Sequence, residues 1–86
     1  MSGGWALFAP GGRQPAHTYD CDAAVAVVKG AATCVVGNRR HTLAERTTLL
    51  QPRGQVHSIS NETSEPMAAI WVCASPMPGR RVVAEA

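Results

Sequence analysis

The chain has 86 residues, a formal net charge of +2 and a hydrophobic content of 45%. Its length predicts one small domain over residues 1–86, near the lower size limit for a stable core. The charge is too small to imply nucleic acid, and the two arginine pairs lack interleaved aromatic residues. No apolar run approaches membrane-spanning length. We therefore expect neither nucleic acid nor a membrane as a partner.

Three cysteines, at positions 21, 34 and 73, are odd in number and widely spaced. This pattern favours reduced thiols in a cytoplasmic protein over a disulfide framework. Cys34 and Cys73 lie in runs rich in Val and Ala, so both are expected in the core. The N-terminus has no basic segment followed by a long apolar run, and no signal peptide is expected. A chain this short leaves much apolar surface uncovered, which predicts a homodimer or larger assembly.

Short apolar runs separated by Gly, Pro and Asn predict a succession of β-strands. In chain order the expected strands cover residues 5–9, 16–20, 23–28, 31–36, 39–43, 47–51, 55–60 and 67–73, with a weaker one at 81–84. Residues 23–28 could also begin a helix, but the run is short and ends at Lys29-Gly30. Gly37-Asn38 is typical of a two-residue hairpin turn. The predicted fold class is all-β, a sandwich or barrel.

Two motifs stand out against this background. The upstream one, at about residues 11–30, reads Gly11-x5-His17-x-Tyr19-x3-Ala23-x6-Gly30. The downstream one, at about 46–61, contains P-R-G-Q-V-H-S-I-S-N, a tight turn followed by a strand that carries His57. Both are similar to the signature motifs of the cupin superfamily, and the tail E-P-M-A-A-I-W-V is similar to the strand that follows them. The resemblance implies a cupin-type small β-barrel, a jelly roll of two antiparallel sheets.

In cupins, two histidines and a glutamate of the first motif join the histidine of the second motif around one metal ion. His17 and His57 match two of these ligands. Tyr19 stands at the place of the second histidine, and Ala23 at that of the glutamate. Arg46-Thr47 replaces the glycine-aspartate pair that usually opens the second motif. The resemblance therefore implies the cupin fold with a reduced or non-standard metal site at His17 and His57.

The residues support a similar reading without the family. Side chains two apart on a strand share a face, so His17, Tyr19 and Cys21 are expected to point the same way. His57, on another strand, would meet them inside the barrel. Two imidazoles suit Zn, Fe, Ni or Cu, but a stable site generally needs three or four protein ligands. Cys21, as a thiolate, or a residue of a partner chain would complete it. We expect at most one divalent transition metal, weakly bound or absent.

Several functions remain open. The first is a binding module that holds a small organic molecule in the barrel, with Tyr19 and Cys21 as contacts. The second is a metal-dependent enzyme of the dioxygenase, isomerase or lyase type, as the resemblance implies. In it Tyr19 would act as a general acid or substrate anchor. Without metal, His57 or His17 could act as a general base. The third is an accessory subunit with a relic site. Cys21 could also simply fill the core.

Four further residues have simpler expected roles. Asn61 is predicted to close the strand at 55–60, with side-chain bonds to the local backbone. His41, just after the expected hairpin, is predicted to be exposed. Trp71 is expected in barrel packing or a subunit interface. Trp5 is expected to cover one barrel end or to lie in that interface.

Overall fold

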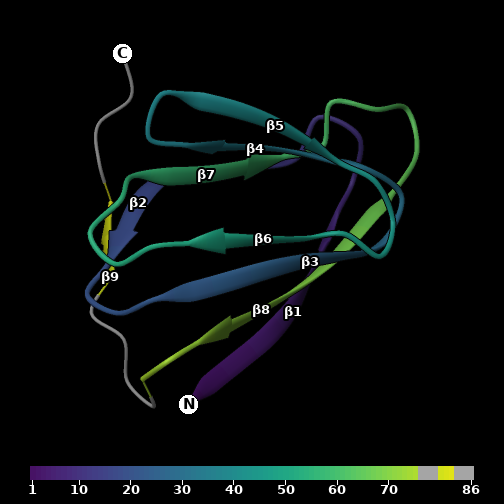
Figure 1. The fold of residues 1–86 in the computed structure, drawn as a ribbon. Helices are drawn as coiled ribbons and strands as arrows, with labels where there is room; N and C mark the ends of the chain where they lie inside the picture. The colour runs from purple at the N-terminus through teal and green to yellow at the C-terminus, as the bar shows by residue number, and fades with distance from the viewer. Residues whose placement is uncertain (76–79, 83–86) are drawn as a thin grey trace.

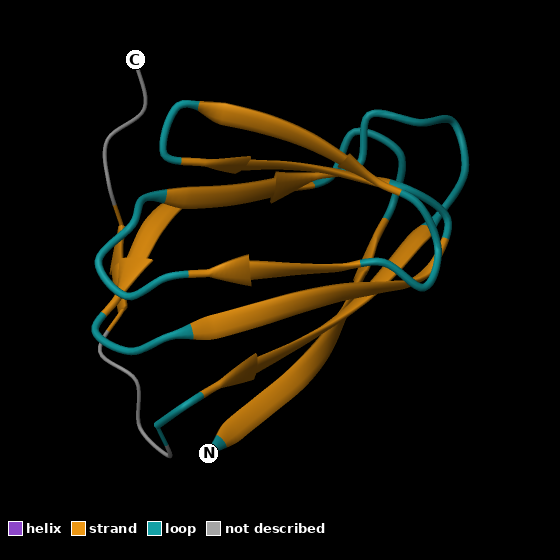
Figure 2. Cartoon of the chain, in the orientation of Figure 1, coloured by secondary structure: helices purple, strands orange, loops and turns teal. Residues whose placement is uncertain are grey.

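The computed structural model describes residues 1–75 and 80–82, and this part of the chain contains nine strands and no helix. The strands are β1 (Ser2–Phe8), β2 (Arg13–Tyr19), β3 (Ala23–Lys29), β4 (Ala32–Val36), β5 (Arg39–Leu43), β6 (Thr48–Gln51), β7 (His57–Ser60), β8 (Met67–Cys73) and β9 (Arg80–Val82). The predicted all-β fold is confirmed (Figure 2). The weak strand expected at 81–84 begins one residue earlier, and its last two residues lie outside the described part.

The strands form two antiparallel sheets that face each other as two layers (Figure 1). One sheet has the order β1-β8-β3-β6 and the other has the order β5-β4-β7-β2-β9. Neighbours in each sheet are mostly distant in sequence, as in a jelly roll. The predicted jelly roll of two antiparallel sheets is therefore confirmed.

Two local patterns fix the boundaries of these strands. Along β1, exposed and half-buried residues alternate strictly, as expected when one face of a strand points inward. Between β4 and β5, Val36 pairs with Arg39, so the connection is a two-residue turn. Gly37 in this turn has φ of 63°, a conformation that costs glycine little. The predicted hairpin at Gly37-Asn38 is confirmed.

The β2 strand begins at Arg13, three residues before the predicted start. A proline at position 15 argues against a regular strand, because it has no N–H for the ladder. The structure accommodates Pro15 in a β-bulge: Gln14 pairs with Ile59 and His17 with His57, so two residues of β2 oppose one of β7. The bulge explains why sequence periodicity placed the start of this strand too late.

The hydrophobic core lies between the sheets. Its fully buried side chains include Met67, Val27 and Cys34, with Phe8 and Leu49 packed at its margin. Burial raises the pKa of the Cys34 thiol from 9.0 to about 11. Cys34 and Cys73 are both completely buried, as predicted.

Asn61 joins the end of β7 to the neighbouring loops. Its side chain is fully buried, and Nδ2 donates to the carbonyls of Phe8 at 3.0 Å and Glu65 at 2.7 Å. Oδ1 accepts from the N–H and the hydroxyl of Thr63. The predicted turn role is confirmed, and the bond to Phe8 extends it to the opposite sheet.

The described part of the chain forms no helix long and apolar enough to cross a membrane.

Candidate functional site

A cavity of about 50 Å³ lies between the two sheets. Its volume is enough for a few water molecules or for the polar end of a small ligand. The described residues that line it are Ala6, Phe8, Gln14, His17, Tyr19, Val25, Gln51, His57, Ile59, Ala69 and Trp71. The polar members are two imidazoles, one phenol and two amides, and none of these lining residues is a carboxylate, lysine or arginine.

The two histidines meet because their strands place them directly opposite each other. His17 on β2 pairs with His57 on β7. Their ring centroids are 4.2 Å apart at an interplanar angle of 67°. The Tyr19 ring lies 5.1 Å from His17 and 5.3 Å from His57. The structure therefore brings together His17, Tyr19 and His57 as the sequence predicted.

The bulge in β2 decides which side chains reach the cavity. In a regular strand, residues three apart lie on opposite faces. The extra residue at Pro15-Ala16 shifts this alternation by one, and Gln14, His17 and Tyr19 all line the cavity. The site thus depends on an irregularity in the strand.

Both imidazoles are held by backbone carbonyl groups. Nδ1 of His17 lies 2.8 Å from the Pro15 carbonyl oxygen, and Nδ1 of His57 lies 3.1 Å from that of Gln55. A carbonyl can only accept, so each Nδ1 carries the proton and donates it. In the neutral imidazole the lone pair is then on Nε2. The two rings are also 1% and 2% exposed, and Nε2 of His57 is itself buried.

The turn before β7 is tied to the end of β2. The Gly54 N–H donates to the Tyr19 carbonyl at 2.9 Å, and the Arg53 N–H donates to the Asp22 carboxylate at 2.8 Å. Gly54 has φ of 76°, which favours glycine at this position. Because the turn at residues 53–54 is followed by two residues of irregular chain, β7 begins at His57, two residues later than predicted. This role of Asp22 was not predicted.

Cys21 does not reach the histidines. β2 ends at Tyr19, and a bend at residues 20–21 interrupts the alternation on which the prediction for Cys21 relied. The side chain is half-buried and lies beside Cys73, whose pKa is raised by burial and by the neighbouring Cys21 thiol. Within residues 1–75 and 80–82, no group of three or more His, Cys, Asp or Glu side chains is arranged to hold a metal ion.

Two amides, Gln14 and Gln51, and two aromatic residues, Phe8 and Trp71, line the cavity without having been predicted there from the sequence. Gln14 is brought inside by the bulge, which no sequence periodicity indicates. Gln51 is 5% exposed and pairs directly with Ala23, the residue at the place of the glutamate in the cupin motif. Trp71 lies over Gly4, where an added Cβ would come within 2.9 Å of the indole. The expected barrel packing of Trp71 is thus correct, but its place in the cavity depends on the pairing with Gly4, which only the sheet register shows.

His41 lies outside the lining of the cavity. It is half-buried on β5, whereas the sequence predicted an exposed side chain. The reason is its register, because His41 pairs with the core residue Cys34 and shares its inward face.

Comparison with known proteins agrees with this geometry. A family model described as the cupin domain matches residues 4–73. The chain belongs to this family. Its resemblance to cupins in the two motifs is therefore confirmed, although the cupin motif residues at positions 19 and 23 differ.

Solved structures show the same fold. One is an uncharacterised protein with a double-stranded β-helix domain from Klebsiella pneumoniae, 22% identical, with a TM-score of 0.88 over 96% of this cupin and 74% of that chain. An oxalate oxidase is 24% identical, with a TM-score of 0.87 over 95% and 45% of the two chains. A salicylate 1,2-dioxygenase from Pseudaminobacter salicylatoxidans is 28% identical, with a TM-score of 0.75 over 80% and 20%. This cupin thus spans less than half of either enzyme. A comparison with curated proteins found no match.

Proposed function

We propose that this cupin binds a small polar organic molecule in the cavity, between His17, His57 and Tyr19. The observation that carries the proposal is the matched hydrogen bonding of the two imidazoles, with each Nδ1 donating to a carbonyl two residues earlier. This fixes the orientation of both rings, which line the cavity, and places the lone pair of each neutral imidazole on Nε2. A ligand that brings O–H or N–H donors would pair with them.

The rest of the lining narrows the class of ligand. The Tyr19 hydroxyl and the amides of Gln14 and Gln51 can each donate or accept. None of the described lining residues carries a fixed charge to compensate an anionic ligand. We therefore expect a small neutral molecule with hydroxyl or amide groups, sized for a cavity of about 50 Å³. Phe8 and Trp71 would cover its apolar part.

The metal site usual in cupins does not fit these residues. Two imidazoles remain, and the positions of the other two ligands hold Tyr19 and Ala23. Zn and similar ions generally require three or four protein ligands, and Cys21 is turned toward Cys73. Gln51 pairs with Ala23 and is the polar residue nearest to the position of the missing glutamate, but its side chain is a neutral amide and not a carboxylate. We expect a divalent transition metal to bind weakly or not at all.

A metal-dependent enzyme is the second candidate. The same two Nε2 atoms are the ligands that a transition metal would take. The likeness to a salicylate 1,2-dioxygenase at 28% identity supports this reading. Loss of two of the four family ligands makes it the weaker of the two.

Elemental analysis and a thermal-shift screen separate the candidates. We would measure metal per chain in untagged protein, and then screen small polyols, hydroxy amides and hydroxy acids for an increase in Tm. Wild type and the His41→Ala control should respond to the same compound, because His41 lies outside the cavity lining. His17→Ala and His57→Ala should lose the response while remaining folded.

Each result has a defined meaning. An unchanged response in His57→Ala would contradict the proposed site. Near-stoichiometric metal that is lost in His57→Ala and kept in His41→Ala would favour the enzyme. Absence of metal and of any ligand response would favour an accessory protein with a relic site.

A further inference from the structure

The outer face of the β1-β8-β3-β6 sheet is apolar. Two complete rows cross it: Gly3, Val72, Ala24 and Leu50 in one, and Trp5, Ile70, Ala26 and Thr48 in the other. Side chains directly opposite each other in a sheet share a face, so these eight positions form one surface. Only Thr48 among them is polar, and none is charged. We call the eight positions the apolar face.

This surface is exposed in the single chain. Among the described residues, the large hydrophobic side chains that are exposed are Met1, Trp5, Leu7, Val28, Leu50, Ile70 and Val72. All belong to the outer surface of this sheet or its N-terminal end. Trp5 is 68% and Leu50 is 63% exposed. Such a concentration on one side is unusual for a monomer and indicates an interface.

We propose that the apolar face, together with the exposed Met1, Leu7 and Val28 beside it, is the interface between two copies of this chain, packed sheet against sheet. At roughly 100 Å² for a fully exposed aliphatic side chain and more for tryptophan, the seven residues present on the order of 500 Å². The intervening Ala, Gly and Thr residues and the backbone bring this close to the roughly 800 Å² per partner that a stable interface buries. The area is thus sufficient for a homodimer.

The shape of the face also suits a second copy. A shallow hollow of about 180 Å³ lies at one end, lined in part by Ala24, Leu50 and Val72. The small side chains on β3 create it between larger ones on β6 and β8. Trp5 projects from the β1 edge of the same face. In a two-fold dimer the Trp5 of each copy enters the hollow of the other, which is the self-complementary contact that such symmetry requires.

Analytical ultracentrifugation over a dilution series tests this interface. Wild type should sediment as a dimer of the 9.0 kDa chain. Trp5→Glu and Leu50→Glu should each raise the dimer dissociation constant at least about 30-fold, the size of an interface hot-spot effect. Thr42→Glu is the matched control, because it adds the same charge to an exposed position on the other sheet and should leave the dimer intact.

A monomeric chain, or a chain that binds a membrane through this face, would give different results in the same experiments. Circular dichroism would establish that each variant is folded, as expected for substitutions at exposed positions. A wild-type chain that is monomeric throughout, or variants that dimerise as tightly as wild type, would overturn the proposal. Monomeric wild type that co-sediments with vesicles of phosphatidylcholine and phosphatidylserine would assign the face to a membrane surface and would also overturn it.

Discussion

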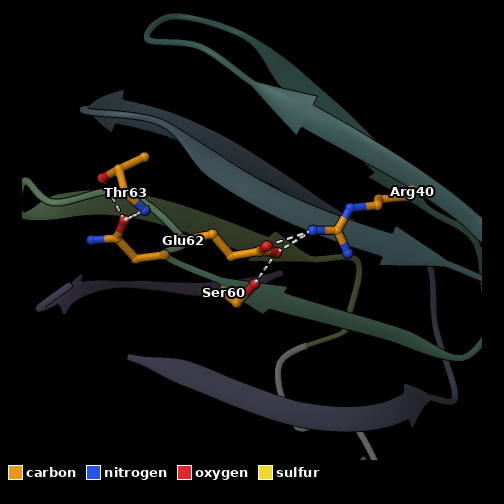
Figure 3. Close-up of polar contacts among 5 residues, drawn as sticks. Arg40, Ser60, Glu62 and Thr63 are labelled. Carbon is orange, nitrogen blue, oxygen red and sulfur yellow. Dashed lines mark hydrogen bonds and ion pairs between the residues drawn. The ribbon is translucent and has the colours of Figure 1, made fainter. Parts of the chain in front are cut away.

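The sheet β5-β4-β7-β2-β9 supplies both histidines and Tyr19 to the cavity, whereas β1-β8-β3-β6 contributes mainly apolar walls. The outer surface of the first sheet is also more polar than that of the second. On the first sheet, Ser60 and the Arg40–Glu62 ion pair face the solvent, with Nη2 of Arg40 2.6 Å from a Glu62 oxygen (Figure 3). On the second, the apolar face is exposed.

This contrast separates two physical tasks. A sheet with one polar and one apolar face is stable with water on one side, but a sheet that is apolar on both faces is normally covered on both. In this cupin the polar sheet holds the candidate site, and the other sheet carries the surface that we propose for dimerisation. Changes on the apolar face should therefore alter association without altering the cavity.

The largest expected effect is inside the apolar sheet. Met67→Ala should lower the free energy of unfolding by about 2–5 kcal/mol, because the side chain is fully buried and its loss leaves a void. Urea denaturation in the monomeric Leu50→Glu background measures it. Ile70→Ala on the same strand, where the side chain is 41% exposed, should cost less than about 1 kcal/mol. Equal losses for both would remove the distinction between the two faces of β8.

Substitution of Asn61, which connects the two sheets, should destabilise the fold nearly as much. Asn61→Ala removes the Nδ2 donor, so the carbonyls of Phe8 on the opposite sheet and of Glu65 lose this hydrogen bond. The expected loss is about 2 kcal/mol in the free energy of unfolding, again measured with urea. Asn38→Ala in the exposed hairpin turn serves as the control and should have little effect. If the two substitutions cost the same, Asn61 does not join the sheets energetically.

The buried thiol of the polar sheet should make stability depend on pH only in the alkaline range. The folded-state pKa of Cys34, about 11, lies above its ordinary value of 9.0. Its contribution to stability is complete below pH 9.0 and is lost as the pH rises from there toward about 11, because the unfolded chain releases its proton first. The pH dependence of wild-type denaturation, minus that of Cys34→Ala, isolates this term. A flat difference over that window would contradict the burial of Cys34.

The smallest effect is on the polar outer surface. Arg40→Ala should change the free energy of unfolding by less than about 1 kcal/mol, as for other exposed ion pairs. The hydrogen bond from Arg40 is the main cause that lowers the pKa of Glu62, so this pKa should rise toward 4.5 in the variant. A pH titration of the Glu62 carboxyl signal by NMR measures the change, and an unchanged pKa would mean that the ion pair does not form in solution.

Much of the fold could be predicted from the turn-forming residues in the sequence. Turn residues such as Gly37-Asn38 separate the strands, and motif spacing placed His17 and His57 together. Strand periodicity failed where the backbone departs from a regular strand. It put Cys21 beside the histidines, although the chain bends after Tyr19, and it left out Gln14, which a bulge turns inward. Gln51 was missed because its importance comes only from its pairing with Ala23.

The bulge at Pro15 also means that β2 contains one residue more than its pairing with β7 requires. Without Pro15, Gln14 could still oppose Ile59, and His17 could still oppose His57, in a regular ladder. What would disappear is the carbonyl that accepts the Nδ1 proton of His17. The position of this imidazole and its tautomer are thus encoded by different residues. Deletion of Pro15 would remove the acceptor that fixes which ring nitrogen of His17 carries the proton, while the pairing of His17 with His57 is kept.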